Sequence, residues 1–134
     1  MWPASHDGHG QPSMIGSCER FQRPAVRSTR LGRHGVALID DPDSRWRVDL
    51  TAARWKRSHE PIMEGCPCPS CEAGHTRGYL RYLLRNRELT GVRLLTVHNL
   101  AYLARLMADL RAAIAAGTLA ERAAALRGGA PPAC

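Results

Sequence analysis

The segment Cys66-Pro67-Cys68-Pro69-Ser70-Cys71 constrains this chain more than any other part of its sequence. Its three cysteines lie within six residues, and its two prolines restrict the backbone between them. Three thiolates so close together would repel one another once ionised, and a bound cation removes that repulsion. Zinc binds thiolate sulfur at about 2.3 Å and imidazole nitrogen at about 2.0 Å, with four ligands in a tetrahedron. The spacing therefore predicts a zinc site that fixes the elements on either side of it.

A fourth ligand must come from elsewhere in the chain, and histidine is the natural candidate. His98 follows Cys71 after twenty-six intervening residues, which leaves room for a helix and a return of the chain. His75 follows Cys71 after three intervening residues, which is also a workable zinc spacing, and His59 precedes the cluster. Spacing alone leaves these alternatives open. Protein side chains would fill all four positions, so the expected site is structural, with no place for a catalytic water.

Length and charge limit the remaining possibilities. The 134 residues suffice for one modest domain, and arginine supplies all but one of the 19 basic residues that give a net charge of +7. Arginine suits phosphate and base recognition, so nucleic acid is a reasonable partner. No apolar run of roughly eighteen residues predicts a membrane span, and residues 1–16 lack the apolar core of a signal peptide. An odd count of five cysteines favours a metal site in the reducing cytoplasm over a disulfide framework.

Short apolar runs before the cysteines indicate a β-hairpin. Residues 36–39 are apolar, residues 40–44 are turn-forming, and residues 46–50 alternate between apolar and polar. We expect an antiparallel hairpin with Gly35 at its entry, continued by a short strand or turn at residues 52–55. Residues 1–22 show no periodicity and are expected to be disordered.

After the cysteines, apolar residues recur at helical spacings. A helix is predicted over residues 77–89, with Gly91 ending it or lying in the link that follows. Residues 94–97 fit either a buried strand or a helix start, and the apolar stripe from Leu100 to Ile114 is expected to be core. Thr118 and Glu121 predict a capping box for a last helix over residues 119–127.

The densest basic stretch lies before the hairpin and comprises Arg20, Arg23, Arg27, Arg30 and Arg33. On spacing alone, a solvated charged loop accounts for it. The sequence has no glycine-rich phosphate loop, no Ser-His-Asp arrangement and no nucleotide fingerprint. The aspartates of residues 40–43 fit a turn better than a catalytic acid/base pair.

Several segments occur in a specific order: Ser28-Thr29-Arg30-Leu31-Gly32-Arg33-His34-Gly35, the cysteine cluster, Tyr79-Leu80-Arg81-Tyr82-Leu83, and Leu94-Leu95-Thr96-Val97-His98-Asn99-Leu100. Arg111-Ala112-Ala113-Ile114 followed by Gly117 extends the pattern. In this order the segments resemble bacterial tRNA-guanine transglycosylases, over residues 26–127. Each segment alone is common, whereas the combination is highly specific.

The resemblance implies an enzyme family that exchanges guanine at the wobble position of certain tRNA anticodons for a 7-deazaguanine base, the route to queuosine. It implies an α+β fragment made of the last elements of a TIM (β/α)8 barrel with an inserted β-hairpin and helix zinc-binding subdomain. One structural Zn²⁺ per chain is implied, on ligands that correspond to Cys66, Cys68, Cys71 and His98. The arginines that contact the tRNA anticodon loop in the family correspond to Arg30 and Arg33.

The sequence departs from the family pattern at the catalytic position. The family's nucleophilic aspartate lies six residues before the first of those arginines, where this chain has Pro24. A second catalytic aspartate and the base pocket belong to the N-terminal half of the barrel, and a complete barrel takes about 250 residues. We therefore assign no catalytic residue and expect no activity from this chain alone. The expected organisation is a disordered or unrelated leader (1–25), the transglycosylase-like portion (26–127) and a flexible tail (128–134).

Barrel elements without their usual neighbours would expose apolar faces, so we expect association with a partner. A second copy of the chain or a full-length homologue would satisfy this expectation, because family members form dimers. The alternative function is a non-catalytic zinc module that binds tRNA or serves as an accessory subunit of such a homologue.

Overall fold

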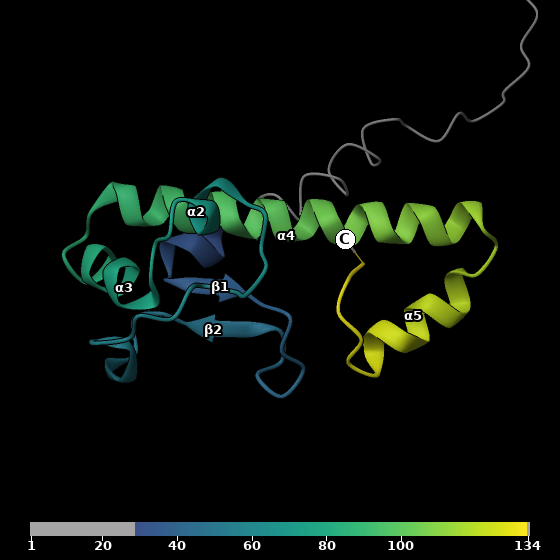
Figure 1. The fold of residues 1–134 in the computed structure, drawn as a ribbon, viewed down its shortest axis with the longest axis horizontal. Coiled ribbons are helices and arrows are strands. Elements are labelled where there is room, and N and C mark those ends of the chain that lie inside the picture. Colours follow the sequence, from purple (N-terminus) through teal and green to yellow (C-terminus); the bar gives the residue numbers. More distant parts are fainter. Residues whose placement is uncertain (1–28, 134) are drawn as a thin grey trace, which may run out of the picture.

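The computed structural model describes residues 29–133, arranged around one long helix, α4 (Leu89–Ala115) (Figure 1). The N-terminal half of α4 carries the other elements of the first part of the chain. These are β1 (Val36–Leu38), β2 (Arg47–Asp49), the 3-10 turn η1 (Ala53–Trp55), α2 (Pro69–Glu72) and α3 (Arg77–Arg85). The last helix, α5 (Leu119–Arg127), folds back along the C-terminal half of α4. The described residues are thus a mixture of helices and a few strands, as expected for an α+β protein.

The hairpin forms where the sequence predicts it. β1 and β2 pair antiparallel with Ala37 opposite Val48, and both side chains are buried. Gly35 enters β1 at φ +75°, and a Cβ at this position would lie 2.5 Å from the side chain of Thr51. Glycine is therefore required here both for its backbone conformation and for the close approach. Residues 53–55 form a turn of 3-10 helix, the second of the two expected alternatives.

The predicted role of Gly91 is wrong. α3 ends at Arg85, and Gly91 is buried in the first turn of α4 rather than ending a helix or lying in a link. A Cβ at position 91 would lie 2.8 Å from the Cβ of Leu83, so glycine allows α3 and α4 to approach closely. Residues 94–97 belong to α4, which settles their ambiguity in favour of helix.

The core lies between the hairpin, α3 and the N-terminal half of α4. Its completely buried residues include Leu50 after β2, Ile62 in the following loop, Leu80 of α3 and Leu95 of α4. Burying each such side chain stabilises the fold by about 1.5–3 kcal/mol. Because these four residues come from four separate segments, their packing fixes the hairpin and α3 against α4.

The expectation that the whole stripe from Leu100 to Ile114 is core is wrong. Leu100, Met107 and Ile114 are 43%, 39% and 60% exposed. They recur every seventh residue and therefore lie along one face of α4. The described residues leave this face open because the buried residues Leu95, His98 and Tyr102 turn the opposite side of α4 towards the hairpin, α2 and α3.

α5 spans the predicted residues, but the predicted capping box is wrong, because the Thr118 side chain makes no cap hydrogen bond. Its backbone N–H instead donates to the carbonyl of Ala113 at 2.9 Å, closing the C-terminus of α4 after Gly117. Arg122 pairs with Asp109 at 2.7 Å and ties α5 to α4. The hydrogen bond from Arg122 lowers the pKa of Asp109. The pair therefore stabilises the fold fully above the ordinary carboxyl pKa, and this stabilisation is lost as the pH falls through the lowered pKa of Asp109.

Some expectations concern residues outside the described range of 29–133. They are the leader (1–25), the position of Pro24, and the arginines before residue 29. Within the described range, residues that follow α5 contact it, because Arg122 donates to the carbonyl of Pro131 at 2.7 Å and Pro132 is buried. None of the described helices is both long enough and apolar enough to cross a membrane.

Candidate metal centre

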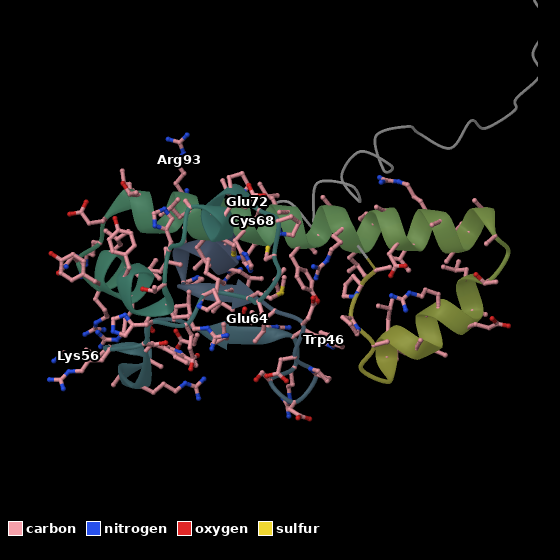
Figure 2. All side chains as sticks on the ribbon, viewed as in Figure 1. Trp46, Lys56, Glu64, Cys68, Glu72 and Arg93 are labelled. Carbon is pink, nitrogen blue, oxygen red and sulfur yellow. The ribbon has the colours of Figure 1, made fainter. Side chains whose placement is uncertain are left out.

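Short-range backbone structure brings the three cysteines together. Cys68 is the N-cap of α2, and its Sγ accepts a hydrogen bond from the N–H of Cys71 at 3.4 Å. Pro69 occupies the first helical position, where its missing N–H would have had no partner within the helix. Cys66 lies in the loop just before, and Cys68 lies beside α4 (Figure 2). The start of α2 and the loop just before it therefore bring the sulfur atoms of Cys66, Cys68 and Cys71 to one point.

α4 supplies a nitrogen to the same point. His98 is completely buried, and its Nδ1 lies 3.6, 3.5 and 3.4 Å from the Sγ atoms of Cys66, Cys68 and Cys71. All four atoms lie within 4.8 Å of one another. In a tetrahedral zinc site, the nitrogen and sulfur ligands are about 3.5 Å apart. These residues therefore can bind a metal ion, and their separations fit zinc.

The protonation of His98 suits a ligand. Its Nε2–H donates to the carbonyl of Leu38 at 2.8 Å, so the lone pair lies on Nδ1, facing the sulfur atoms. That lone pair can accept a hydrogen bond from only one thiol, whereas three sulfur atoms surround it. A cation at the centre would satisfy all four groups at once. Burial lowers the pKa of His98, which favours the neutral imidazole that metals bind.

The thiols are poorly suited to act as free nucleophiles. Burial raises the pKa of the Cys66 and Cys71 thiols, so at pH 7 they stay protonated unless a cation stabilises the thiolate. Cys66, Cys68 and Cys71 are all free thiols and form no disulfide. This environment favours metal binding over thiol redox chemistry.

Metal binding at pH 7 is expected to release about two or more protons per chain, because burial raises the pKa of the Cys66 and Cys71 thiols, which are protonated before binding and become thiolates afterwards. Burial lowers the pKa of His98, so this imidazole is neutral before binding and releases no proton. Affinity should therefore rise with pH, by about tenfold per pH unit for each thiol that must be deprotonated. Calorimetric titration with Zn²⁺ in buffers of different ionisation enthalpy counts the protons. A count near zero would show that the thiols are not the ligands.

Asn99 supports the site and was missed by the sequence analysis. It is completely buried, its Oδ1 accepts from the N–H of Leu38 at 2.8 Å, and its Nδ2 donates to the carbonyl of Val36 at 2.9 Å. Asn99 thus pairs with the backbone groups of β1 that do not pair with β2, and holds the strand whose carbonyl orients His98. The available signal was the adjacent polar pair His98 and Asn99 within the otherwise largely apolar segment 97–103.

Ser70 is a second supporting residue that the sequence analysis missed. Its side chain is 1% exposed, and its Oγ donates to the carbonyl of Leu94 at 2.8 Å. This bond joins α2, which carries Cys71, to α4, which carries His98. No pattern around Ser70 distinguishes it from an ordinary helix-start serine.

The other candidate residues lie elsewhere. His75 stacks on Tyr79 with ring centroids 5.3 Å apart, and His59 lines a separate hollow. The structure therefore places His98 beside the sulfur atoms, whereas His75 and His59 lie away from them. Arg30 and Arg33 are exposed on a helical turn at residues 29–33 and take no part in the metal cluster.

The described fold and this site define a small α+β module with a closed Cys3His metal centre. A sequence model of the family described as "Queuine tRNA-ribosyltransferase" matches residues 25–129. The chain therefore belongs to this family.

Individual relatives agree. The queuine tRNA-ribosyltransferase of Symbiobacterium thermophilum is 45% identical over 96 residues, which cover 72% of this chain and 23% of that protein. Those of Roseiflexus sp. and Synechococcus sp. strain CC9311 are 38% and 44% identical over 96 residues, covering 72% of this chain and 24% of each relative. The chain thus spans about a quarter of the length of the curated relatives it matches.

Proposed function

We propose that residues 26–127 are the zinc-binding C-terminal portion of a tRNA-guanine transglycosylase, which exchanges a tRNA wobble guanine for a 7-deazaguanine base. The observation that carries this proposal is the four-ligand cluster of Cys66, Cys68, Cys71 and His98 inside the region that matches the family. In this proposal the cluster holds one structural Zn²⁺, and α4 is the closing helix of a (β/α)8 barrel. The hairpin, α2 and α3 are the inserted zinc subdomain. Reduced thiols of this kind fit a cytoplasmic protein.

Zinc would act here by fixing structure rather than by chemistry. All four ligands come from the protein, which leaves no coordination position for a water or substrate. The site joins α2 to α4, and through the carbonyl of Leu38 it joins α4 to β1. α4 also carries the turn at residues 29–33, on a side of the helix different from that of His98, since a Cβ at Gly32 would lie 2.5 Å from Oγ1 of Thr96. The metal would therefore position Arg30 and Arg33.

Arg30 and Arg33 are proposed to contact the anticodon loop. Both are exposed, and their spacing of three places them on one face of the helical turn. Within residues 29–133, neither is in an ion pair. Two neighbouring guanidinium groups without acidic partners suit the phosphates of RNA.

Catalysis is proposed to need residues beyond those of this portion. In the family, a nucleophilic aspartate displaces guanine from the ribose and forms a covalent intermediate that the incoming base resolves. The corresponding position in this sequence is Pro24, which cannot act as a nucleophile. We therefore expect tRNA binding without base exchange.

Replacing Arg30 and Arg33 by alanine is expected to weaken binding to a tRNA anticodon stem-loop about tenfold or more, and to reduce the slope of log affinity against log salt by between about one and two. Fluorescence anisotropy at several salt concentrations measures both. The double variant Arg111→Ala, Arg127→Ala is the matched control, because it removes the same two charges from exposed positions on α4 and α5. Equal losses from this control would show that binding depends on net charge alone. Guanine exchange by the unmodified chain would place the nucleophile elsewhere in it.

A second candidate function is an accessory subunit that pairs with a full-length homologue or with a second copy. The exposed apolar face of α4 at Leu100, Met107 and Ile114 favours it. Tyr79 and Tyr82 of α3 are also exposed, at 44% and 64%. Sedimentation of the chain alone and with a full-length family member tests this function. A monomer in both cases would argue against it.

A further inference from the structure

The segment at residues 53–57 is a basic projection built around one aromatic ring. It contains Arg54, Lys56 and Arg57, all exposed, and no acidic residue. Figure 2 shows Lys56 at the end of the molecule away from α5. This segment is separate from the metal site and from the turn that carries Arg30 and Arg33.

Trp55 at the centre of the projection is held rigidly. Its Nε1–H donates to the carbonyl of Asp49 at 2.9 Å. The guanidinium groups of Arg54 and Arg77 each lie 4.6 Å from its ring centroid, close enough for cation–π attraction. Arg77 is itself fixed by Glu60 at 2.9 Å and by the carbonyl of Ile62 at 3.1 Å. The indole therefore needs little ordering when a ligand binds.

Two residues of α3 fix the ends of the projection. Nε of Arg81 donates to the carbonyl of Ala52 at 3.0 Å. The N–H of Gly78 donates to the carbonyl of Ser58 at 3.1 Å, and a Cβ at Gly78 would lie 2.6 Å from that oxygen. Such close backbone contact makes the projection part of the folded module rather than a loose loop.

The projection borders two hollows on the surface. One has a volume of ≈ 620 Å³ and the other ≈ 410 Å³, and Arg54, Trp55 and Glu64 line both. The first also includes Arg57 and Glu60, and the charge of Glu60 is balanced by Arg77. Asp40 and Asp41 line the second hollow, so the cationic groove is the first hollow, where Arg54, Trp55 and Arg57 lie and which the exposed Lys56 adjoins in the chain.

We propose that this groove binds a single-stranded RNA segment, with phosphates on Arg54, Lys56 and Arg57 and a base stacked on the Arg54–Trp55 pair. Single-stranded nucleic acid is recognised by this combination, because bases stack on aromatic rings and guanidinium planes while cations follow the backbone. An anionic membrane surface is less suited, because the indole is anchored at Asp49 beneath a guanidinium group and cannot insert into lipid. This inference rests on the proposed function in one respect: the groove would add a second RNA contact to the proposed contact of Arg30 and Arg33 with the anticodon loop.

The test compares two RNAs and two sets of substitutions by fluorescence anisotropy. The triple variant Arg54→Ser, Lys56→Ser, Arg57→Ser is expected to bind a dodecameric oligouridine roughly tenfold more weakly. Its salt slope should fall by about two, as expected for three lost phosphate contacts on a single strand. Its affinity for the anticodon stem-loop should change little, whereas the variant lacking Arg30 and Arg33 should show the opposite pattern.

Controls separate the groove from net charge and from misfolding. Arg85→Ser, Arg111→Ser, Arg127→Ser removes the same charge from exposed positions elsewhere and should leave oligouridine binding unchanged. Metal content and melting temperature confirm that each variant is folded. Oligouridine should also change the tryptophan fluorescence of the unmodified chain, and Trp55→Phe should abolish that change while retaining most of the affinity.

Two results would overturn the proposal. One is unchanged oligouridine affinity in a folded triple variant. The other is binding to phosphatidylserine vesicles without binding to oligouridine, which would make the projection a lipid contact. If the unmodified chain binds oligouridine but not the anticodon stem-loop, the proposed function fails while the RNA groove stands.

Discussion

Cys68→Ser is expected to abolish metal binding and cooperative folding. Cys68 is 1% exposed, caps α2 and places its sulfur 3.5 Å from Nδ1 of His98. Serine keeps the cap but offers a hydroxyl, which is a poor zinc ligand beside two thiolates. Structural zinc sites contribute apparent free energies of about 10–16 kcal/mol, similar to or above the whole stability of an ordinary domain. The variant should therefore lose its metal and its sharp thermal transition, as the unmodified chain should in excess chelator.

Metal analysis and thermal melting followed by circular dichroism measure these effects. His98→Ala should behave like Cys68→Ser, because it removes the only nitrogen ligand of the cluster. His75→Ala is the matched control, since His75 stacks on Tyr79 outside the cluster, and it should keep one metal ion per chain. A Cys68→Ser protein that melts at the unmodified temperature would show that metal does not hold this fold together.

Asn99→Leu should lower the free energy of unfolding by about 2–5 kcal/mol. The substitution removes two hydrogen bonds and leaves the N–H of Leu38 and the carbonyl of Val36 buried without partners, at about 1–3 kcal/mol for each group. Leucine has a similar volume, so the loss should come from unpaired polar groups rather than from a cavity. The Leu38 carbonyl that orients His98 should also move, and zinc affinity should fall with it.

Urea denaturation at saturating zinc gives the stability, and competition with a chromogenic chelator gives the zinc affinity. Asn86→Leu makes the same change at an exposed position at the end of α3 and should alter stability by less than about 0.5 kcal/mol. Similar midpoints for the two variants would mean that Asn99 does not hold β1 against α4.

Much of the local structure followed from the sequence because its signals are short-range. Alternation and turn residues predicted the hairpin, and apolar periodicity predicted α3 to within a few residues. The bounds of α5 were predicted from a capping box whose side-chain hydrogen bond does not form. The prediction failed at Gly91, where the usual signal for a helix end instead marks a close crossing of α3 and α4. It also failed for the exposed stripe on α4, since periodicity shows which residues share a face but not what covers that face.

The sequence by itself predicted that three thiols would meet, because three cysteines within six residues, with prolines restricting the backbone between them, have the close spacing typical of a metal site. Which histidine lies close enough to be the fourth ligand was shown only by the tertiary structure. His75 is nearer in the sequence, but it packs against α3, whereas the reversal of the chain after α3 brings His98 to the sulfur atoms. Asn99 gained its role in the same way, from a strand about sixty residues earlier in the chain. Contacts between distant segments depend on packing and hydrogen bonding across the whole fold, and local sequence patterns do not contain that information.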